Sequence, residues 1–123
     1  MIEGVVNASR EAVIPLTLRG TAGRTLNIEA IIDTGFGGFL TLPPALVAEL
    51  GLTLEGIGRA TLGDGSEITF PCYDVAVLWE GLPRYGLADE ANTTPLVGMR
   101  LLERHGLYVE VEDGGRVTIE ARA

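Results

Sequence analysis

One aspartate at the end of an apolar segment is the residue in this chain best suited to chemistry. Asp33 follows the stretch 26–32, in which five of seven residues are apolar, so we expect a strand to deliver it from the core. A carboxylate in that position is costly unless it is hydrogen-bonded or paired. Thr34 offers a compact hydroxyl donor, and Gly35 lets the backbone turn sharply and bring N–H groups near the carboxylate. The segment Ile31 to Gly35 therefore predicts a carboxylate poised for acid or base chemistry, although Asp-Thr-Gly also occurs in ordinary strand-ending turns.

The other reactive side chains favour structural roles. Cys72 lies in an apolar stretch and is expected to be a buried thiol, and His105 is expected near a helix end, where a cation is favourable. These two residues are too few to form a zinc site of the usual kind, and we expect neither a metal nor an organic cofactor. Asp64 belongs to an Asp-Gly pair, which favours a turn residue over a second catalytic acid.

Short strands and tight turns must position Asp33. Apolar residues alternate at 14–18 and again at 26–32, which predicts a β-hairpin around Gly20 to Gly23 whose second strand ends at Asp33. Further strands are expected at 59–62, 68–70, 75–79, 84–88, 107–111 and 116–119. Gly63-Asp64-Gly65-Ser66 predicts a tight hairpin turn between the first two of these.

Two short helices complete the predicted elements. Pro44 suits the first turn of a helix from Ala45 to Leu50, and Gly51 suits its end. A second helix is expected from Leu101 to His105, ended by Gly106. Nearly the same pattern surrounds both segments: Leu46 to Leu52 aligns with Leu101 to Leu107, and 58–62 aligns with 115–119. This order predicts a duplicated helix-plus-strand unit, of which only the first copy follows an Asp-Thr-Gly segment.

Composition narrows the class of protein. A chain of 123 residues with 46% apolar residues and 17 glycines is expected to form one mainly β domain over residues 1–123. The net charge of −8 argues against nucleic acid or an anionic membrane as a partner. A single cysteine excludes an intrachain disulfide and fits a reducing compartment. With no signal pattern and no membrane-spanning run, a cytoplasmic location is expected.

The order of these motifs resembles the retropepsin-like aspartic proteases, in particular the small cellular members of clan AA from bacteria and archaea. That family has two apolar residues before Asp-Thr-Gly, then a strand and a short helix, a flap hairpin with glycine, and a late apolar-apolar-Gly element followed by a helix. The corresponding segments here are Ile31 to Gly35, Phe39 to Leu50, Gly63 to Ser66, and Leu96-Val97-Gly98 with Leu101 to His105. The resemblance covers about Val13 to Ile119.

The resemblance implies a fold and a role for each matching residue. It implies an all-β, closed-barrel fold of the acid-protease type with two short helices, acting as a homodimer on peptide or protein substrates. Asp33 would be the catalytic acid/base, Thr34 would join the two active-site loops across the dimer axis, and Gly35 would shape the loop. Gly63, Asp64, Gly65 and Ser66 would form the tip of a flap. Leu96 to Gly98 would support the loop from beneath.

The number of carboxylates gives an independent reason to expect a dimer. Peptide hydrolysis by carboxylates uses a pair, one accepting a proton from water and one donating to the substrate carbonyl. The chain has one Asp-Thr-Gly, and Glu29, Glu49, Asp89 and Asp113 read as solvated charges on polar faces or turns. A twofold axis would supply the second carboxylate, and the apolar strands at the two chain ends are expected to interleave across the interface.

Two departures from the family keep other interpretations open. Phe36 and Gly37 stand where many relatives have a small residue and a nearby hydroxyl, and Arg100 stands where close relatives often have an acid. The first alternative is therefore a catalytically inactive homodimer of the same fold that binds peptides or serves a structural role. The second is an unrelated, monomeric small β domain whose Asp-Thr-Gly is a turn.

Overall fold

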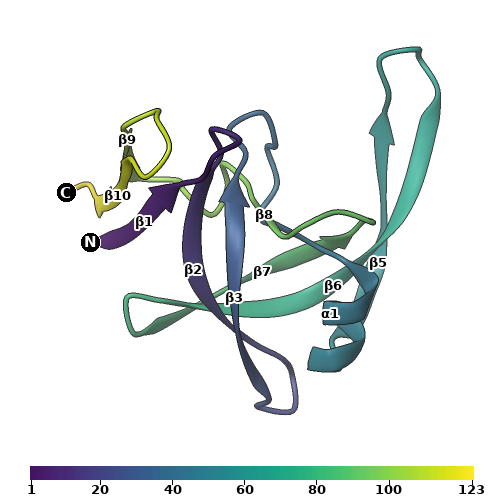
Figure 1. Cartoon of the computed structure of the whole chain (residues 1–123). Coiled ribbons are helices and arrows are strands. Elements are labelled where there is room, and N and C mark those ends of the chain that lie inside the picture. Colours follow the sequence, from purple (N-terminus) through teal and green to yellow (C-terminus); the bar gives the residue numbers. More distant parts are fainter.

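The computed structural model describes all residues, 1–123, as one sheet of ten strands with one short helix (Figure 1). The strands are β1 (Ile2–Val6), β2 (Ala12–Arg19), β3 (Thr25–Ile32), β4 (Leu40–Leu42), β5 (Thr53–Thr61), β6 (Glu67–Trp79), β7 (Leu82–Glu90), β8 (Leu96–Val97), β9 (His105–Val109) and β10 (Arg116–Ala121). The helix is α1 (Pro44–Leu50). The predicted mainly β class is confirmed.

The hairpin that leads to Asp33 forms as its alternating pattern predicts. β2 and β3 pair antiparallel from Val13↔Ile31 to Arg19↔Thr25. The inward side chains Ile14, Leu16 and Leu18 are buried, because successive residues of a strand face opposite sides. The hairpin register therefore fixes the end of β3, where Asp33 follows.

Long-range pairings connect this hairpin into a ring of strands. The sheet order is β5-β6-β7-β4-β8-β3-β2-β1-β10-β9, and β6 also pairs with β2 over Thr17 to Arg19. The strands β2, β3, β8, β4, β7 and β6 therefore follow one another as hydrogen-bonded neighbours back to β2. Within this ring the short β8 lies between β3, to which it is parallel, and β4, to which it is antiparallel.

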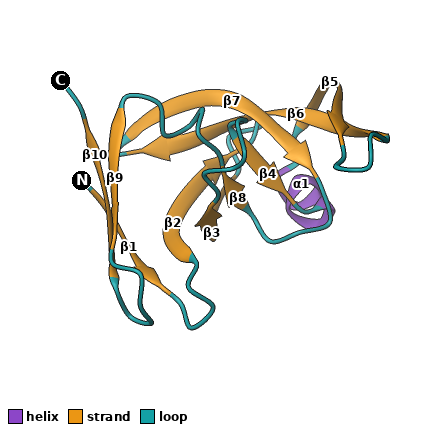
Figure 2. Ribbon diagram, turned by 90° about the horizontal axis from the view of Figure 1, so that it is seen from above, coloured by secondary structure: helices purple, strands orange, loops and turns teal.

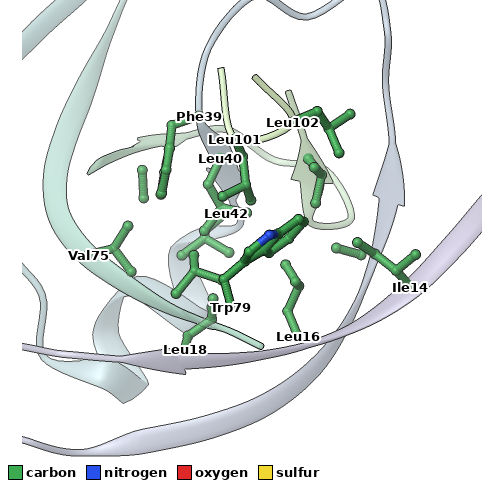
Figure 3. Close-up of a cluster of buried hydrophobic side chains, with 14 of the residues drawn as sticks. Ile14, Leu16, Leu18, Phe39, Leu40, Leu42, Val75, Trp79, Leu101 and Leu102 are labelled. Carbon is green, nitrogen blue, oxygen red and sulfur yellow. The ribbon is translucent and has the colours of Figure 1, made fainter. Parts of the chain in front are cut away.

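The ring surrounds the hydrophobic core (Figure 3). Trp79 lies among leucines and valines from β2, β4, β6 and the segment after β8, and its ring is 5% exposed. Its indole Nε1 donates a hydrogen bond of 3.0 Å to Nε2 of His105, which satisfies the one polar atom of the indole. Burial of these side chains is the main favourable term for folding.

The chain ends form a ribbon of β1, β10 and β9 that joins the ring through β2 (Figure 2). β1 pairs with β2 and β10, and β10 pairs with β1 and β9, so both edges of each terminal strand are already occupied within one chain. The expected interleaving of terminal strands between two chains would require these pairings to break. The edge of the ribbon that lacks a partner strand belongs to β9.

The first predicted helix is confirmed and the second is wrong. α1 begins with Pro44 at its first position and ends at Gly51, which adopts the left-handed conformation at φ 60°. Residues 101–105 instead form hydrogen-bonded turns: Arg104 has φ 65°, and His105 already belongs to β9. A residue with positive φ interrupts a right-handed helix, so this segment is too short to form one. No helix of the structure is long and apolar enough to cross a membrane.

The two copies of the predicted repeat also fold differently. The first copy contains α1 and the continuous strand β5. In the second copy the turns replace the helix. The second copy has two more residues than the first between its aligned segments, and these lie in the turn between β9 and β10, which pair as a hairpin. The sequence similarity therefore does not correspond to a repeated helix-plus-strand unit.

Candidate active site

Asp33 lies where β3 leaves the sheet beside β8. Ile31 and Ile32 pair in parallel with Leu96 and Val97, and the backbone N–H of Asp33 donates to the carbonyl of Val97 at 2.9 Å. The side chain of Asp33 is half-buried at the surface of the loop that follows. The strand pairing thus fixes the backbone of Asp33 while its carboxylate stays accessible.

The residues after Asp33 fold back onto it. The N–H of Gly35 donates to Oδ1 of Asp33 at 3.0 Å, and the N–H of Phe36 donates to the Asp33 carbonyl at 3.1 Å. A Cβ at position 35 would lie 3.3 Å from Oδ1, so a larger residue would crowd the carboxylate. Thr34, like Gly35, is exposed at the tip of this turn. The partner of the carboxylate within one chain is therefore the Gly35 N–H, and Thr34 faces outward.

A close backbone contact supports the loop from the side of β8. The N–H of Met99 donates to the Phe36 carbonyl at 2.8 Å, and the N–H of Arg100 donates to the Gly38 carbonyl at 3.1 Å. A Cβ on Gly98 would lie only 2.0 Å from the Gly38 carbonyl oxygen and 2.6 Å from the Phe36 ring. The two segments can approach this closely only because position 98 is glycine.

Phe36 has a structural role that its type alone did not reveal. Its ring is half-buried against Gly38 and Gly98, and a Cβ on Gly38 would lie 2.5 Å from ring atoms. The sequence signal was present, since glycines at 37, 38 and 98 accompany Phe36, but which of them touch its ring depends on the pairing of β8 with β3 and β4. Phe36 therefore packs between the loop and the segment after β8, and it has no hydroxyl that could hydrogen-bond to Asp33.

The hairpin expected to carry a flap extends away from the body of the protein (Figure 1). β5 and β6 pair up to Thr61↔Glu67, and the tip closes through a bond of 2.7 Å from the N–H of Leu62 to the carbonyl of Ser66. Gly65 has φ 86°, the positive value that a tight turn demands. Every residue from 61 to 69 is exposed. The predicted turn is confirmed.

Asp64 acts within this turn. Its Oδ1 accepts hydrogen bonds from the hydroxyl of Ser66 at 2.6 Å and from the Ser66 N–H at 2.9 Å. Both bonds hold the pKa of the Asp64 carboxyl below its ordinary value, and the bond from the Ser66 hydroxyl has the larger effect. The Asp64 carboxylate thus orders the hairpin tip. The tip makes no hydrogen bond to the Asp33 loop, whose backbone bonds go to β8 and the residues that follow it.

The remaining reactive residues lie on other elements. Cys72 is buried on β6, where its thiol lies 3.4 Å from Oδ1 of Asp89 on β7, and burial raises the pKa of both groups. His105 accepts from Trp79, and its Nδ1 lies 2.8 Å from the Glu103 carbonyl. The Asp33 loop and the segment after β8, residues 33–39 and 95–100, contain no acid besides Asp33. One chain therefore presents a single carboxylate at this site.

The fold is similar to that of a known protease structure. It matches the crystal structure of a retropepsin-like aspartic protease from Rickettsia conorii with a TM-score of 0.58 and 19% sequence identity, over 99% of this chain and 91% of that chain. No protein-family model matches the sequence, and neither does any curated protein. At this level of identity the similarity establishes a retropepsin-like fold.

Proposed function

We propose that this chain is an aspartic endopeptidase that hydrolyses peptide or protein substrates as a homodimer. The observation that carries the proposal is the presentation of Asp33: an accessible carboxylate, bonded to the Gly35 N–H, at the end of a strand that β8 holds in place. The retropepsin-like fold supports it, because that architecture is used by a protease. The proposal requires no metal or organic cofactor.

The reaction needs two carboxylates with different protonation states. In the proposed dimer, Asp33 of one protomer lies next to Asp33 of its partner. The pair shares one proton because two adjacent negative charges repel each other. The ionised carboxylate accepts a proton from water as the oxygen attacks the peptide carbonyl. The protonated one donates to the carbonyl oxygen, which gives a tetrahedral intermediate. The carboxyl that took the water proton then passes it to the amide nitrogen as the C–N bond breaks. The other carboxylate recovers a proton from a hydroxyl of the intermediate, so the amine leaves, a carboxylic acid forms and the pair again holds one proton.

The exposed residues around Asp33 fit a surface that a second chain would cover. Thr34 and Gly35 are exposed at the loop tip, and the Met99 side chain beside the loop is 47% exposed. In the proposed dimer Thr34 would bond to the partner's loop and Gly35 would keep the carboxylate in place. Gly63 to Ser66 would close over the bound peptide as the tip of a flap.

One observation favours a second candidate, an inactive homodimer that binds peptides. No side-chain hydroxyl of the chain hydrogen-bonds to Asp33, and the Gly35 N–H is the only donor that one chain brings to that carboxylate. Such a module would keep the dimer and the peptide groove but would not activate water.

Hydrolysis across the acid-to-neutral range separates the two candidates. The endopeptidase should cleave an unstructured protein such as casein with a bell-shaped pH dependence whose optimum lies below neutral, because activity requires one shared proton. Asp33→Asn should abolish cleavage and leave the fold intact, since the amide has the same shape. Peptide binding without cleavage by the unmodified protein would favour the inactive module. Equal cleavage by the wild-type and Asp33→Asn proteins would mean that Asp33 is not catalytic.

A further inference from the structure

A second candidate binding site lies at the opposite end of the β2–β3 hairpin from Asp33. A surface cavity of about 520 Å³ is bounded by the turn of this hairpin and by the middle of β6 and β7. Arg19, at the cavity, pairs with Thr25, which begins β3, whereas Asp33 follows Ile32 at the other end of that strand. At about 3.3 Å per residue, the length of β3 puts roughly 23 Å between the two sites.

The cavity exists because β6 changes its neighbour on one edge. Along β6 in chain order, Asp74 is the last residue paired with β5, opposite Thr53, and Ala76 is the first residue paired with β2, opposite Arg19. β2 ends at Arg19 and β5 begins at Thr53, so Val75 has no partner on this edge and the notch lies beside it. A hydrogen bond of 3.1 Å between the hydroxyls of Thr21 and Thr53 joins the two sides of this notch. The notch is thus bounded by the sheet and by the turn of the β2–β3 hairpin.

The side chains around the notch combine a cation with apolar surface. Arg19, Ala76 and Tyr85 form one cross-strand row, so the small alanine lies between a guanidinium and a phenol. Nη2 of Arg19 lies 3.4 Å from the Tyr85 hydroxyl, and neither salt bridge of the chain involves Arg19. Tyr85 is 74% exposed, and Leu87, one step along the same face of β7, is 41% exposed.

We propose that this notch binds a peptide segment that carries a carboxylate next to an apolar side chain, as an accessory site for the polypeptide substrate. The carboxylate would pair with Arg19, which can offer two parallel N–H donors. The apolar side chain would pack on Tyr85, a residue type that often anchors interfaces, and on the neighbouring Leu87. Asp74 would accept a backbone N–H of the peptide. That the peptide belongs to a substrate rests on the proposed function.

Binding to the Asp33→Asn protein tests the site without any turnover. The probe is a fluorescein-labelled peptide in which glutamates alternate with leucines, and a matched peptide carries glutamine at each glutamate. The acidic probe should bind, and its affinity should fall about tenfold or more when Arg19→Gln is added, because a charge-assisted hydrogen bond is lost. Tyr85→Ala should also weaken binding. Arg122→Gln, which removes an exposed arginine near the C-terminus, should have no effect.

Amide chemical shifts locate the bound probe. They should change at Thr21, Ala76 and Leu87 and remain unchanged at Thr34 and Gly35. Absence of binding, equal affinity for the glutamate and glutamine peptides, or shifts confined to the Asp33 loop would overturn the assignment. Because the probe is measured on a protein without the catalytic carboxylate, loss of the accessory site and loss of the protease function give different results.

Discussion

At the scale of residues, the Asp33 loop depends on one contact between backbones. The carbonyl of Gly38 and the ring of Phe36 occupy the space that a side chain at position 98 would need. Asp33 itself is held from the same direction, through the carbonyl of Val97 next to Gly98. A change at position 98 therefore reaches the candidate catalytic residue through two neighbouring segments.

Gly98→Ala should destabilise the fold and reduce any activity. The added methyl would meet the Gly38 carbonyl at 2.0 Å, so the backbone must move, and overpacking of this kind costs about 1–3 kcal/mol. Gly37→Ala is the matched control, because a Cβ there meets nothing within 4 Å. Urea unfolding of both variants measures the difference. Equal stability of the two would mean that the β8 segment does not support the loop as described.

Asp89→Asn should stabilise the protein at neutral pH. Burial raises the pKa of Asp89 above that of the unfolded chain, so the folded state holds its proton more tightly. Stability linked to this group is fully present below the unfolded pKa and is lost as pH rises through the raised value. The amide carries no charge to bury, and its oxygen can still accept from the Cys72 thiol.

Thermal unfolding at several pH values measures this effect. Because Asp89 is only partly buried, the gain at neutral pH should be small, about 1–3 °C in Tm, and should vanish in acid. Asp113→Asn, in an exposed turn, is the control and should change nothing at either pH. A loss of stability at neutral pH would contradict the assigned cause of the shift.

At the scale of elements, local sequence patterns predicted those strands, turns and helices that depend on residues close together in the chain. The alternation in 14–18 and 26–32 predicted the β2–β3 hairpin, and Pro44 with Gly51 predicted α1. The two-residue β8 was missed, because Leu96 and Val97 form a strand only through their pairing with β3 and β4. β1 was also missed in the local pattern, since its partner β10 lies at the other end of the chain.

The same distinction applies to the candidate site. Asp33, Thr34 and Gly35 could be named from their own types and from the apolar segment before them. The resemblance implied that Leu96 to Gly98 would support the loop. The close approach of Gly98 to Gly38 and the packing of Phe36 could not be predicted, because they require knowing which strand lies between β3 and β4. The second helix was predicted over Leu101 to His105 with Gly106 as its end, but Arg104 adopts positive φ and the chain enters β9 one residue later.

Gly65→Val should reduce hydrolysis more than it reduces stability. Gly65 has φ 86°, which a β-branched residue adopts only with strain, so the tip of the β5–β6 hairpin should distort. Nothing lies within 4 Å of a Cβ there, so the core should be unaffected. Gly63→Val is the control, since Gly63 has no positive φ and equally open surroundings.

Casein hydrolysis and thermal unfolding of both variants decide the role of the hairpin. A flap that orders over the substrate predicts a fall in kcat/KM of about tenfold or more for Gly65→Val with little change in Tm. Parallel losses of activity and stability would make the hairpin an ordinary structural turn.

At the scale of the whole molecule, the proposed function requires two chains. Dimerisation should cover the exposed surface around Thr34 and Met99, while β1 and β10 keep their pairings within each chain. Sedimentation at low micromolar concentration should therefore give twice the chain mass of 13.0 kDa. A folded monomer at that concentration would contradict the proposed function, because one chain presents a single carboxylate at the site.

Mixing protomers tests the shared dyad most directly. Wild-type chains and Asp33→Asn chains are unfolded together in equal amounts, refolded, and assayed for peptide hydrolysis against wild type at the same total concentration. If both carboxylates are needed, only dimers of two wild-type chains are active, and random pairing makes these about one quarter of the total. The account predicts about 25% of the wild-type activity, whereas about 50% would mean that each chain works alone and would contradict a dyad formed by Asp33 from two protomers.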